Sequence, residues 1–280
     1  MPGPSVQERF SVSDVVRETA KIDPITVEVI RNALLAATEE MGATLRRSAY
    51  STNVKTRADY SCCFFDRDFR VIAQSFAQPV HLGNMVKLVP ADLRQYGFDR
   101  LEPGDMIVVN DPYLGSIHLN DVTVVAPVFH DGRLFGDLAN LAHHFYVDVC
   151  GGAPASIGAF REIYQEGVQI PPVRLVAQNE IVDDTFRMIL AQIRSKRETA
   201  GDFRAQIAAN LTGARRLIEL LDHGGRETAD RTIDALIRPE LQQQRSIELW
   251  LSASEFLDRV AALIPSPRKH RHPLLRGAGT

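Results

Sequence analysis

Hydrophobic residues recur at helical spacing near the start of the chain. Residues three or four positions apart form one apolar face: Ile30, Leu34, Ala37, Met41 and Leu45. Asp23 followed by Pro24 suits the start of this helix, because aspartate is a good N-cap and proline fits the first helical turn. The pattern therefore predicts a helix from about residue 23 to about Ser48.

Short apolar runs separated by turn residues follow, and they are typical of strands. Residues 60–65 and 69–74 flank three charged residues and form one predicted hairpin, and residues 106–109 form a buried strand after a Pro-Gly-Asp turn. Between them, residues 82–96 have a helical pattern that Pro90 should interrupt or restart.

The longest predicted hairpin consists of strands over residues 121–129 and 133–142. They are joined at Asp131-Gly132, a dipeptide that favours a tight turn. After residue 179 the spacing becomes helical again, with helices predicted over residues 183–197 and 202–221. The predicted class is α+β, a β-rich body with antiparallel hairpins followed by a helical section. Four regions are predicted: a flexible arm over residues 1–21, the β-rich body over 22–180, the helical section over 181–263 and a disordered tail over 264–280.

Composition limits the classes of function. The 280 residues are 45% hydrophobic, enough to bury a core, and the net charge of −3 lacks the basic excess of a nucleic-acid binder. The sequence contains no apolar run of about 20 residues, so no membrane span is predicted. The three cysteines, of which Cys62 and Cys63 are adjacent, form no disulfide framework, and the first residues lack the apolar run of a secretory signal. We therefore expect a cytoplasmic protein with core thiols.

Potential metal ligands lie at the open end of the long hairpin. A two-residue turn would place Asp121 opposite Ala142, and a three-residue turn would move its partner to Leu141 or His143. In each register the start of the first strand lies beside the end of the second, with Cβ atoms about 5 Å apart. His118 precedes Asp121 by three residues and should join it.

These side chains suit a divalent cation. Adjacent strand residues point to opposite faces, so one of His143 and His144 should join His118 and Asp121. Two imidazoles and a carboxylate with open positions are typical of Mn, Fe or Zn. The alternative is that they are polar residues of an exposed hairpin end. His81 could face the same pocket or be a structural histidine.

Several segments, taken in order, resemble the hydantoinase B/oxoprolinase family, which also contains the acetone carboxylase alpha subunit. They are DPITVEVI (23–30), TRADYSC (56–62), PVHLGNM (79–85), NDPY (110–113), HLNDVT (118–123), AHH (142–144), EGVQIPP (166–172) and GDFRAQIAAN (201–210).

The resemblance implies a metal site and a reaction class. It implies that His118, Asp121 and His143 bind a divalent metal, with manganese favoured over zinc or iron. It also implies a hydantoinase A-type partner subunit, which uses ATP to phosphorylate a carbonyl oxygen or an enolate. This chain would then be an enzyme subunit that completes hydrolysis of a cyclic amide or carboxylation of a ketone. His144 and Asp148 are the candidates for a general base.

Two departures from the family keep a third hypothesis open. The family's aspartate usually follows the two histidines closely, whereas here Phe145, Tyr146 and Val147 intervene before Asp148. Family members are also roughly twice as long, so the chain could be a truncated, non-catalytic fragment. The intact set of three ligands favours an enzyme subunit.

Overall fold

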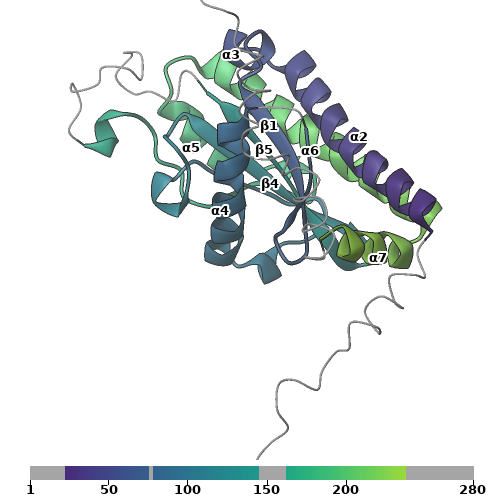
Figure 1. Ribbon diagram of the computed structural model, residues 1–280. Helices are drawn as coiled ribbons and strands as arrows, with labels where there is room; N and C mark the ends of the chain where they lie inside the picture. The colour runs from purple at the N-terminus through teal and green to yellow at the C-terminus, as the bar shows by residue number, and fades with distance from the viewer. Residues whose placement is uncertain (1–22, 76–77, 145–161, 238–280) are drawn as a thin grey trace, which may run out of the picture. The chain divides into compact units, whose positions relative to one another are not determined.

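A computed structural model describes residues 23–75, 78–144 and 162–237 of the chain (Figure 1). The predicted arm over residues 1–21, the segment that carries Asp148 and the predicted tail over residues 264–280 lie outside the described residues. The described residues up to Asp234 belong to one compact unit, which contains the sheet and the helices that cover it.

A seven-stranded antiparallel sheet, in the order β2-β1-β5-β4-β3-β6-β7, forms the centre of this unit. Its strands are β1 (Tyr60–Asp66), β2 (Val71–Gln74), β3 (Met106–Val109), β4 (Asp121–His130), β5 (Arg133–His143), β6 (Val173–Ala177) and β7 (Glu180–Ile181). The α+β class and the antiparallel hairpins predicted from the sequence are confirmed.

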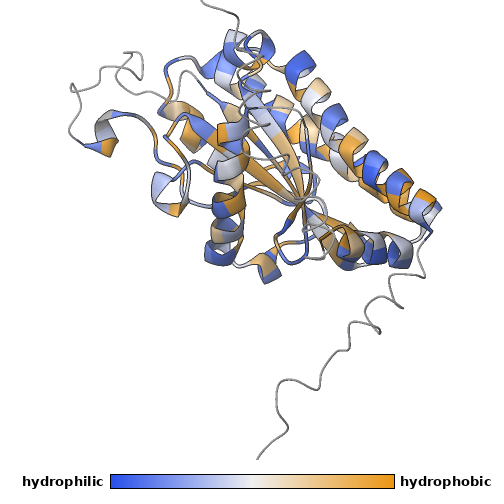
Figure 2. Ribbon diagram, in the orientation of Figure 1, coloured by the Kyte–Doolittle hydropathy of each residue, from blue (hydrophilic) through white to orange (hydrophobic). Residues whose placement is uncertain are grey.

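Helices cover both faces of the sheet. They are α2 (Pro24–Ser48), α3 (Thr52–Lys55), α4 (Pro79–Tyr96), α5 (Asp183–Ala191), α6 (Lys196–Gly224) and α7 (Arg226–Ile237). Helices α2 and α6 pack against each other on one face, and α4 lies on the other (Figure 1). Hydrophobic residues gather on the strands and on the helix faces turned towards them (Figure 2). No helix in the described ranges is both long and apolar enough to cross a membrane.

The turn between β4 and β5 sets the register of the central hairpin. Asp131 and Gly132 have positive φ angles of 51° and 69°, as a two-residue turn of the hairpin type requires. A bulge between Val128 and Phe129 then shifts the register by one residue, so that Asp121 pairs with His143. Of the three partners that the sequence left open for Asp121, the structure selects His143.

Some predicted boundaries were wrong. Helix α4 begins at Pro79 and continues through Pro90 to Tyr96 without a break. The helix predicted over residues 183–197 ends at Ala191, and α6 starts independently at Lys196. Strand β6, which pairs with β3 and extends the sheet, was not predicted from the sequence.

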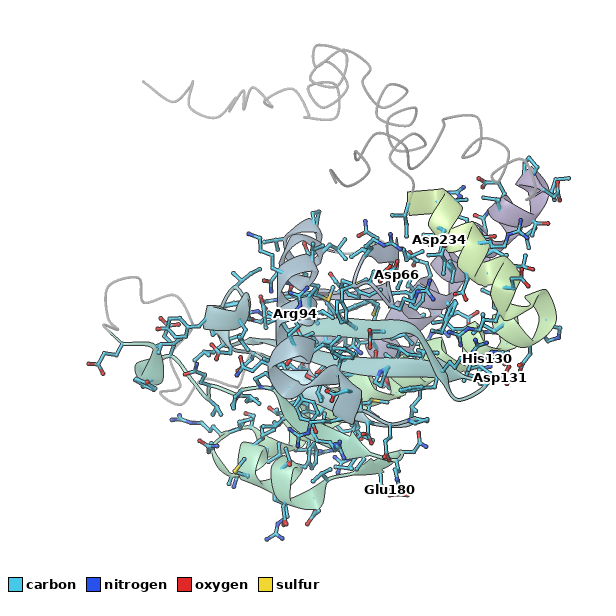
Figure 3. The ribbon with its side chains drawn as sticks, turned by 90° about the horizontal axis from the view of Figure 1, so that it is seen from below. Asp66, Arg94, His130, Asp131, Glu180 and Asp234 are labelled. Atoms are coloured by element: carbon cyan, nitrogen blue, oxygen red, sulfur yellow. The ribbon has the colours of Figure 1, made fainter. Side chains whose placement is uncertain are left out.

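Charged pairs join α6 and α7 to the hairpin tips at one end of the sheet. Arg70 lies 2.6 Å from Asp66 and 3.7 Å from Asp234 of α7. His130, beside the β4–β5 turn, lies 3.1 Å from Asp222 of α6. Figure 3 shows Asp66 and Asp234 in one group and His130 with Asp131 in another. The predicted metal ligands lie at the opposite end of the same hairpin.

Candidate metal centre

His118, Asp121 and His143 converge at the open end of the β4–β5 hairpin. Asp121 is the first residue of β4 and pairs with His143, the last residue of β5. His118 is brought back by a tight turn in which the Asp121 backbone N–H donates to the His118 carbonyl at 3.1 Å. Asp121 Oδ1 lies 2.9 Å from His118 Nε2 and 3.1 Å from His143 Nδ1. The two imidazole rings are 4.7 Å apart between centroids.

The electrostatics of the cluster keep Asp121 ionised. Burial raises the pKa of this carboxyl, which is only 1% exposed, but the hydrogen bonds with His118 and His143 outweigh burial and lower it to about 2. For His118, burial lowers the pKa, yet the hydrogen bond and charge of Asp121 raise it above its ordinary value. The cluster is therefore an anionic oxygen between two imidazoles.

Backbone contacts fix the segments that carry these ligands. The Ser116 hydroxyl lies 3.2 Å from the carbonyl oxygens of both His118 and Asp121. Asn53 donates from its side chain to the His143 carbonyl at 3.1 Å. The His143 N–H donates in turn to the Asp59 carbonyl at 3.0 Å. Segments that precede the hairpin in the chain thus hold both strand ends.

His81 forms a second imidazole–carboxylate pair near the cluster. It is buried on the first turn of α4, with Nε2 3.5 Å from Asp59 Oδ1 and Nδ1 3.3 Å from Ser61 Oγ. Burial lowers its pKa, against the charges of Asp121 and Asp59, which act to raise it. The sequence left open whether His81 faces the metal pocket or is a structural histidine. Its position near the cluster favours the first interpretation. Asn53 and Ser61 were not predicted, and their only signal is that they lie near or within a segment that resembles the family.

The structure places His144 apart from the three clustered residues. Its ring contacts Phe203 at 4.8 Å between centroids, and its Nε2 lies 2.9 Å from Gln206 Oε1 of α6. It follows His143 directly, and the two side chains lie on opposite sides of the sheet. The other predicted general base, Asp148, falls outside the described residues.

The donor set fits a divalent metal ion. One ligand atom from each of His118, Asp121 and His143 lies within 4.8 Å of the others. Two imidazole nitrogens and a carboxylate oxygen are suitable donors for manganese, iron or zinc, and three ligands leave coordination positions open. The arrangement can hold such an ion and leave room for a substrate atom.

The adjacent cysteines have no comparable chemistry. Cys62 and Cys63 are buried in β1 with free thiols, and burial raises the pKa of both. A thiol held protonated is a poor nucleophile and a poor metal ligand. The prediction of core thiols is confirmed.

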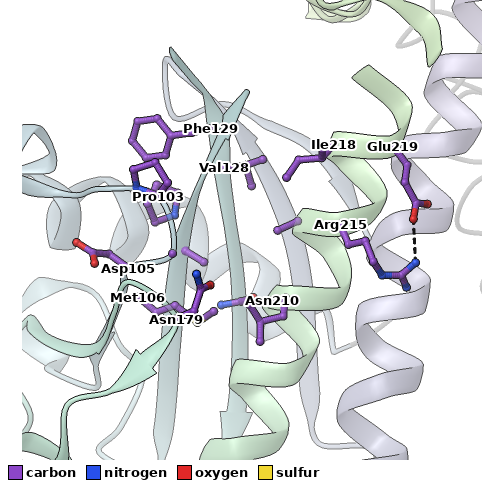
Figure 4. Close-up of a pocket in the computed structure, with 15 residues that line it drawn as sticks. Pro103, Asp105, Met106, Val128, Phe129, Asn179, Asn210, Arg215, Ile218 and Glu219 are labelled. Atoms are coloured by element: carbon purple, nitrogen blue, oxygen red, sulfur yellow. Dashed lines mark hydrogen bonds and ion pairs between the residues drawn. The ribbon is translucent and has the colours of Figure 1, made fainter. Parts of the chain in front are cut away.

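A cavity of about 420 Å³ lies elsewhere, between the tip half of β4 and α6 (Figure 4). Its walls include Met106, Val128 and Ile218, and an ion pair of 3.0 Å between Arg215 and Glu219 lies at its edge. None of the three clustered ligands lines it. This cavity is therefore separate from the candidate metal centre.

Comparisons with known proteins identify the family of the chain. The model of a family described as hydantoinase B/oxoprolinase matches residues 23–253. An uncharacterized protein of Methanocaldococcus jannaschii is 41% identical over 214 residues, 75% of this chain and 38% of that protein. The caprolactamase subunit beta of Pseudomonas jessenii is 36% identical over 230 residues, 78% of this chain and 39% of that subunit.

Two solved structures share the fold. The crystal structure of ATP-dependent caprolactamase from Pseudomonas jessenii has a TM-score of 0.69 at 36% identity, over 77% of this chain and 37% of that one. A nucleotide-free acetone carboxylase structure has a TM-score of 0.70 at 19% identity, over 75% of this chain and 28% of that one. At 19% identity, the likeness to acetone carboxylase shows only that the fold is shared. The chain spans less than two fifths of the length of these relatives.

Proposed function

Since this chain belongs to the hydantoinase B/oxoprolinase family, we propose that it supplies the metal-binding part of an ATP-dependent enzyme that hydrolyses cyclic amides. The observation that carries the proposal is that His118 and His143 converge on the ionised carboxylate of Asp121. The similarity to a caprolactamase subunit at 36% identity favours amide hydrolysis. The carboxylase alternative rests on a likeness of fold at 19% identity.

His118, Asp121 and His143 would hold the metal, with manganese favoured and zinc or iron as alternatives. The ion would polarise a carbonyl or phosphoryl oxygen of the substrate. Asp121 Oδ1 lies within 3.1 Å of a ring nitrogen of each histidine, so one ion could reach all three ligand atoms. Asp148 is our candidate for the general base. His144 is the weaker candidate, because it is buried against Phe203 with its Nε2 bonded to Gln206.

ATP would act on a partner subunit of the hydantoinase A type. The sequence has no Gly-Lys-Ser/Thr phosphate loop, and the caprolactamase relative is a beta subunit, a name that implies a counterpart. We propose that the partner activates the amide by phosphorylation and that this chain completes the hydrolysis as part of a hetero-oligomer.

Metal analysis tests the site directly. We expect the purified chain, after exposure to Mn²⁺ and desalting, to retain one ion, and Asp121→Ala to retain almost none. Asp105→Ala is the matched control, because Asp105 is equally buried at 1% exposure but pairs with Arg174 outside the cluster. If Asp121→Ala retains as much metal as the wild-type chain, the site is misplaced.

A further inference from the structure

We propose that Gln206 is a positioning residue, which holds the metal ligands Asp121 and His143 in place from the opposite face of the sheet. The inference rests on the proposed metal site and concerns residues that do not themselves bind the metal.

Gln206 bonds to the neighbours of both ligands. Its Nε2 donates to the carbonyl oxygen of Val122 at 2.9 Å, and Val122 directly follows Asp121. Its Oε1 lies 2.9 Å from Nε2 of His144, which directly follows His143. A single side chain of α6 therefore ties together the start of β4 and the end of β5.

The polarity of the amide makes this contact specific. Because the NH₂ group of Gln206 is used on the Val122 carbonyl, Oε1 must accept, and His144 Nε2 must carry the proton. Gln206, Val122 and His144 are all buried, at no more than 1% exposure. Separation of the strand ends would leave unpaired polar groups away from water, which costs free energy.

The end of β5 is fixed a second time through its backbone. The His144 N–H donates to the Asn120 carbonyl at 2.8 Å, and the Asn120 side chain donates to the His144 carbonyl at 2.9 Å. These backbone bonds leave the His144 ring to be held separately, by the Gln206 amide and the contact with Phe203.

Helix α6 is well placed to act as the support, because it is anchored one turn to either side of Gln206. Asp202 accepts hydrogen bonds from the backbone N–H groups of Tyr50 and Ser51 at 2.7 and 3.0 Å. Asn210 donates to the Val124 carbonyl at 3.1 Å. Residues at this spacing lie on one helix face, so Gln206 is held in register with the sheet.

Asn210 provides a matched control for a purely structural role. Like Gln206, it is buried at 0% exposure, donates to a β4 carbonyl and accepts from a buried side chain, that of Asn140 at 2.8 Å. Its strand contacts lie farther from the ligands than those of Gln206. Loss of either side chain should destabilise the fold, but only loss of Gln206 should disturb the metal.

The experiment compares Gln206→Met with Asn210→Leu, two changes that keep approximate side-chain size and remove the hydrogen bonds. We expect Gln206→Met to weaken Mn²⁺ affinity by about 10- to 100-fold in competition with a chelator, as for other residues that support metal ligands. Asn210→Leu should leave the affinity unchanged, although thermal unfolding should show both variants destabilised.

Equal affinities for the wild-type chain and Gln206→Met, or equal losses in both variants, would overturn the inference. Should Gln206→Met fail to fold, Gln206→Glu takes its place, because it keeps the acceptor for His144 and loses the donor to Val122. A wild-type chain that binds no metal would overturn the proposed function and this inference together. Normal binding by both wild-type and Gln206 variants would overturn this inference alone.

Discussion

Two buried carboxyl groups, Asp92 of α4 and Asp137 of β5, lie outside the cluster of metal ligands. Both oxygens of Asp92 and one of Asp137 have no hydrogen-bond partner among the described residues. Burial raises the pKa of Asp92 to about 8, and burial together with the charge of Asp66 raises that of Asp137 to about 7. Each carboxyl is therefore held largely as the neutral acid in the folded protein at moderately acidic pH.

The raised pKa of Asp92 predicts that stability falls as pH rises. This carboxyl ionises near pH 4 in the unfolded chain but only near pH 8 in the folded protein. Between these pH values folding therefore requires the uptake of a proton, which becomes less favourable as pH rises. The stabilisation is complete below about pH 4 and is lost progressively up to about pH 8. We expect Asp92→Asn to reduce the loss in free energy of unfolding between pH 5 and 8 by up to about 1.4 kcal/mol per pH unit. Urea denaturation at both pH values measures it, and equal pH dependence in the two proteins would contradict it.

The three candidate ligands could be predicted from the sequence, whereas the residues that support them could not. His118, Asp121 and His143 could be predicted because one hairpin brings them together within 26 positions of sequence, and its turn dipeptide is recognisable. The partner of Asp121 was left open, because the bulge that places an extra residue of β5 opposite Val128 and Phe129 leaves no clear signal in sequence. Asn53 and Gln206 could not be predicted, since they come from elements 90 and 62 residues away from their partners in the hairpin.

At the scale of elements, Gly213 allows α6 to approach both α2 and the sheet. A Cβ atom at this position would lie 2.5 Å from Met41 Sδ and 2.9 Å from Leu138 Cδ1, and both residues are fully buried. A shift of either side chain would disturb the core residues that enclose it. The close packing of α2, α6 and β5 therefore requires a residue without a side chain.

This packing predicts that Gly213→Ala destabilises the protein. Overpacking of a well-packed core typically costs about 1–3 kcal/mol, which exceeds the gain in helix propensity of about 1 kcal/mol. Gly224→Ala is the control, because it lies in the same helix and a Cβ atom there would meet nothing within 4 Å. Denaturant midpoints should separate the two variants. A Gly213→Ala protein as stable as Gly224→Ala would show that the helices can separate without cost.

The elements differ in how well their boundaries could be predicted. Helix α2 was predicted well, because Asp23 caps it through bonds to the Ile25 and Thr26 N–H groups, and such caps are local. Helix α4 was not, because Pro90 is tolerated inside it once its buried face packs on the sheet. Tertiary packing also decides β6, whose partner β3 lies more than 60 residues earlier in the chain. Local signals therefore set the elements with strong caps or turns, and long-range packing sets the rest.

At the scale of the whole molecule, the chain spans less than two fifths of the length of the Methanocaldococcus protein and of the caprolactamase subunit. The structure contains the hairpin that carries the candidate metal ligands and the helices that support it. The caprolactamase structure, described as ATP-dependent, is similar over 77% of this chain at 36% identity. The proposed function therefore assigns the ATP-dependent step to a partner subunit, which an assay of the chain alone can test.

We expect the purified chain alone neither to hydrolyse ATP nor to convert hydantoin, 5-oxoproline or a ketone. Metal polarisation supplies several kcal/mol, whereas enzymes usually lower the barrier by about 8–23 kcal/mol. Phosphorylation of the substrate by an A-type partner would cover much of the difference. The assay combines the chain with ATP, Mn²⁺ and each substrate, with and without that partner. ATP-dependent turnover by the chain alone would place the whole active site within these 280 residues, and no turnover even with the partner would favour a non-catalytic fragment. Loss of turnover in Asp121→Ala, with the partner present, would link the activity to the metal ligands themselves.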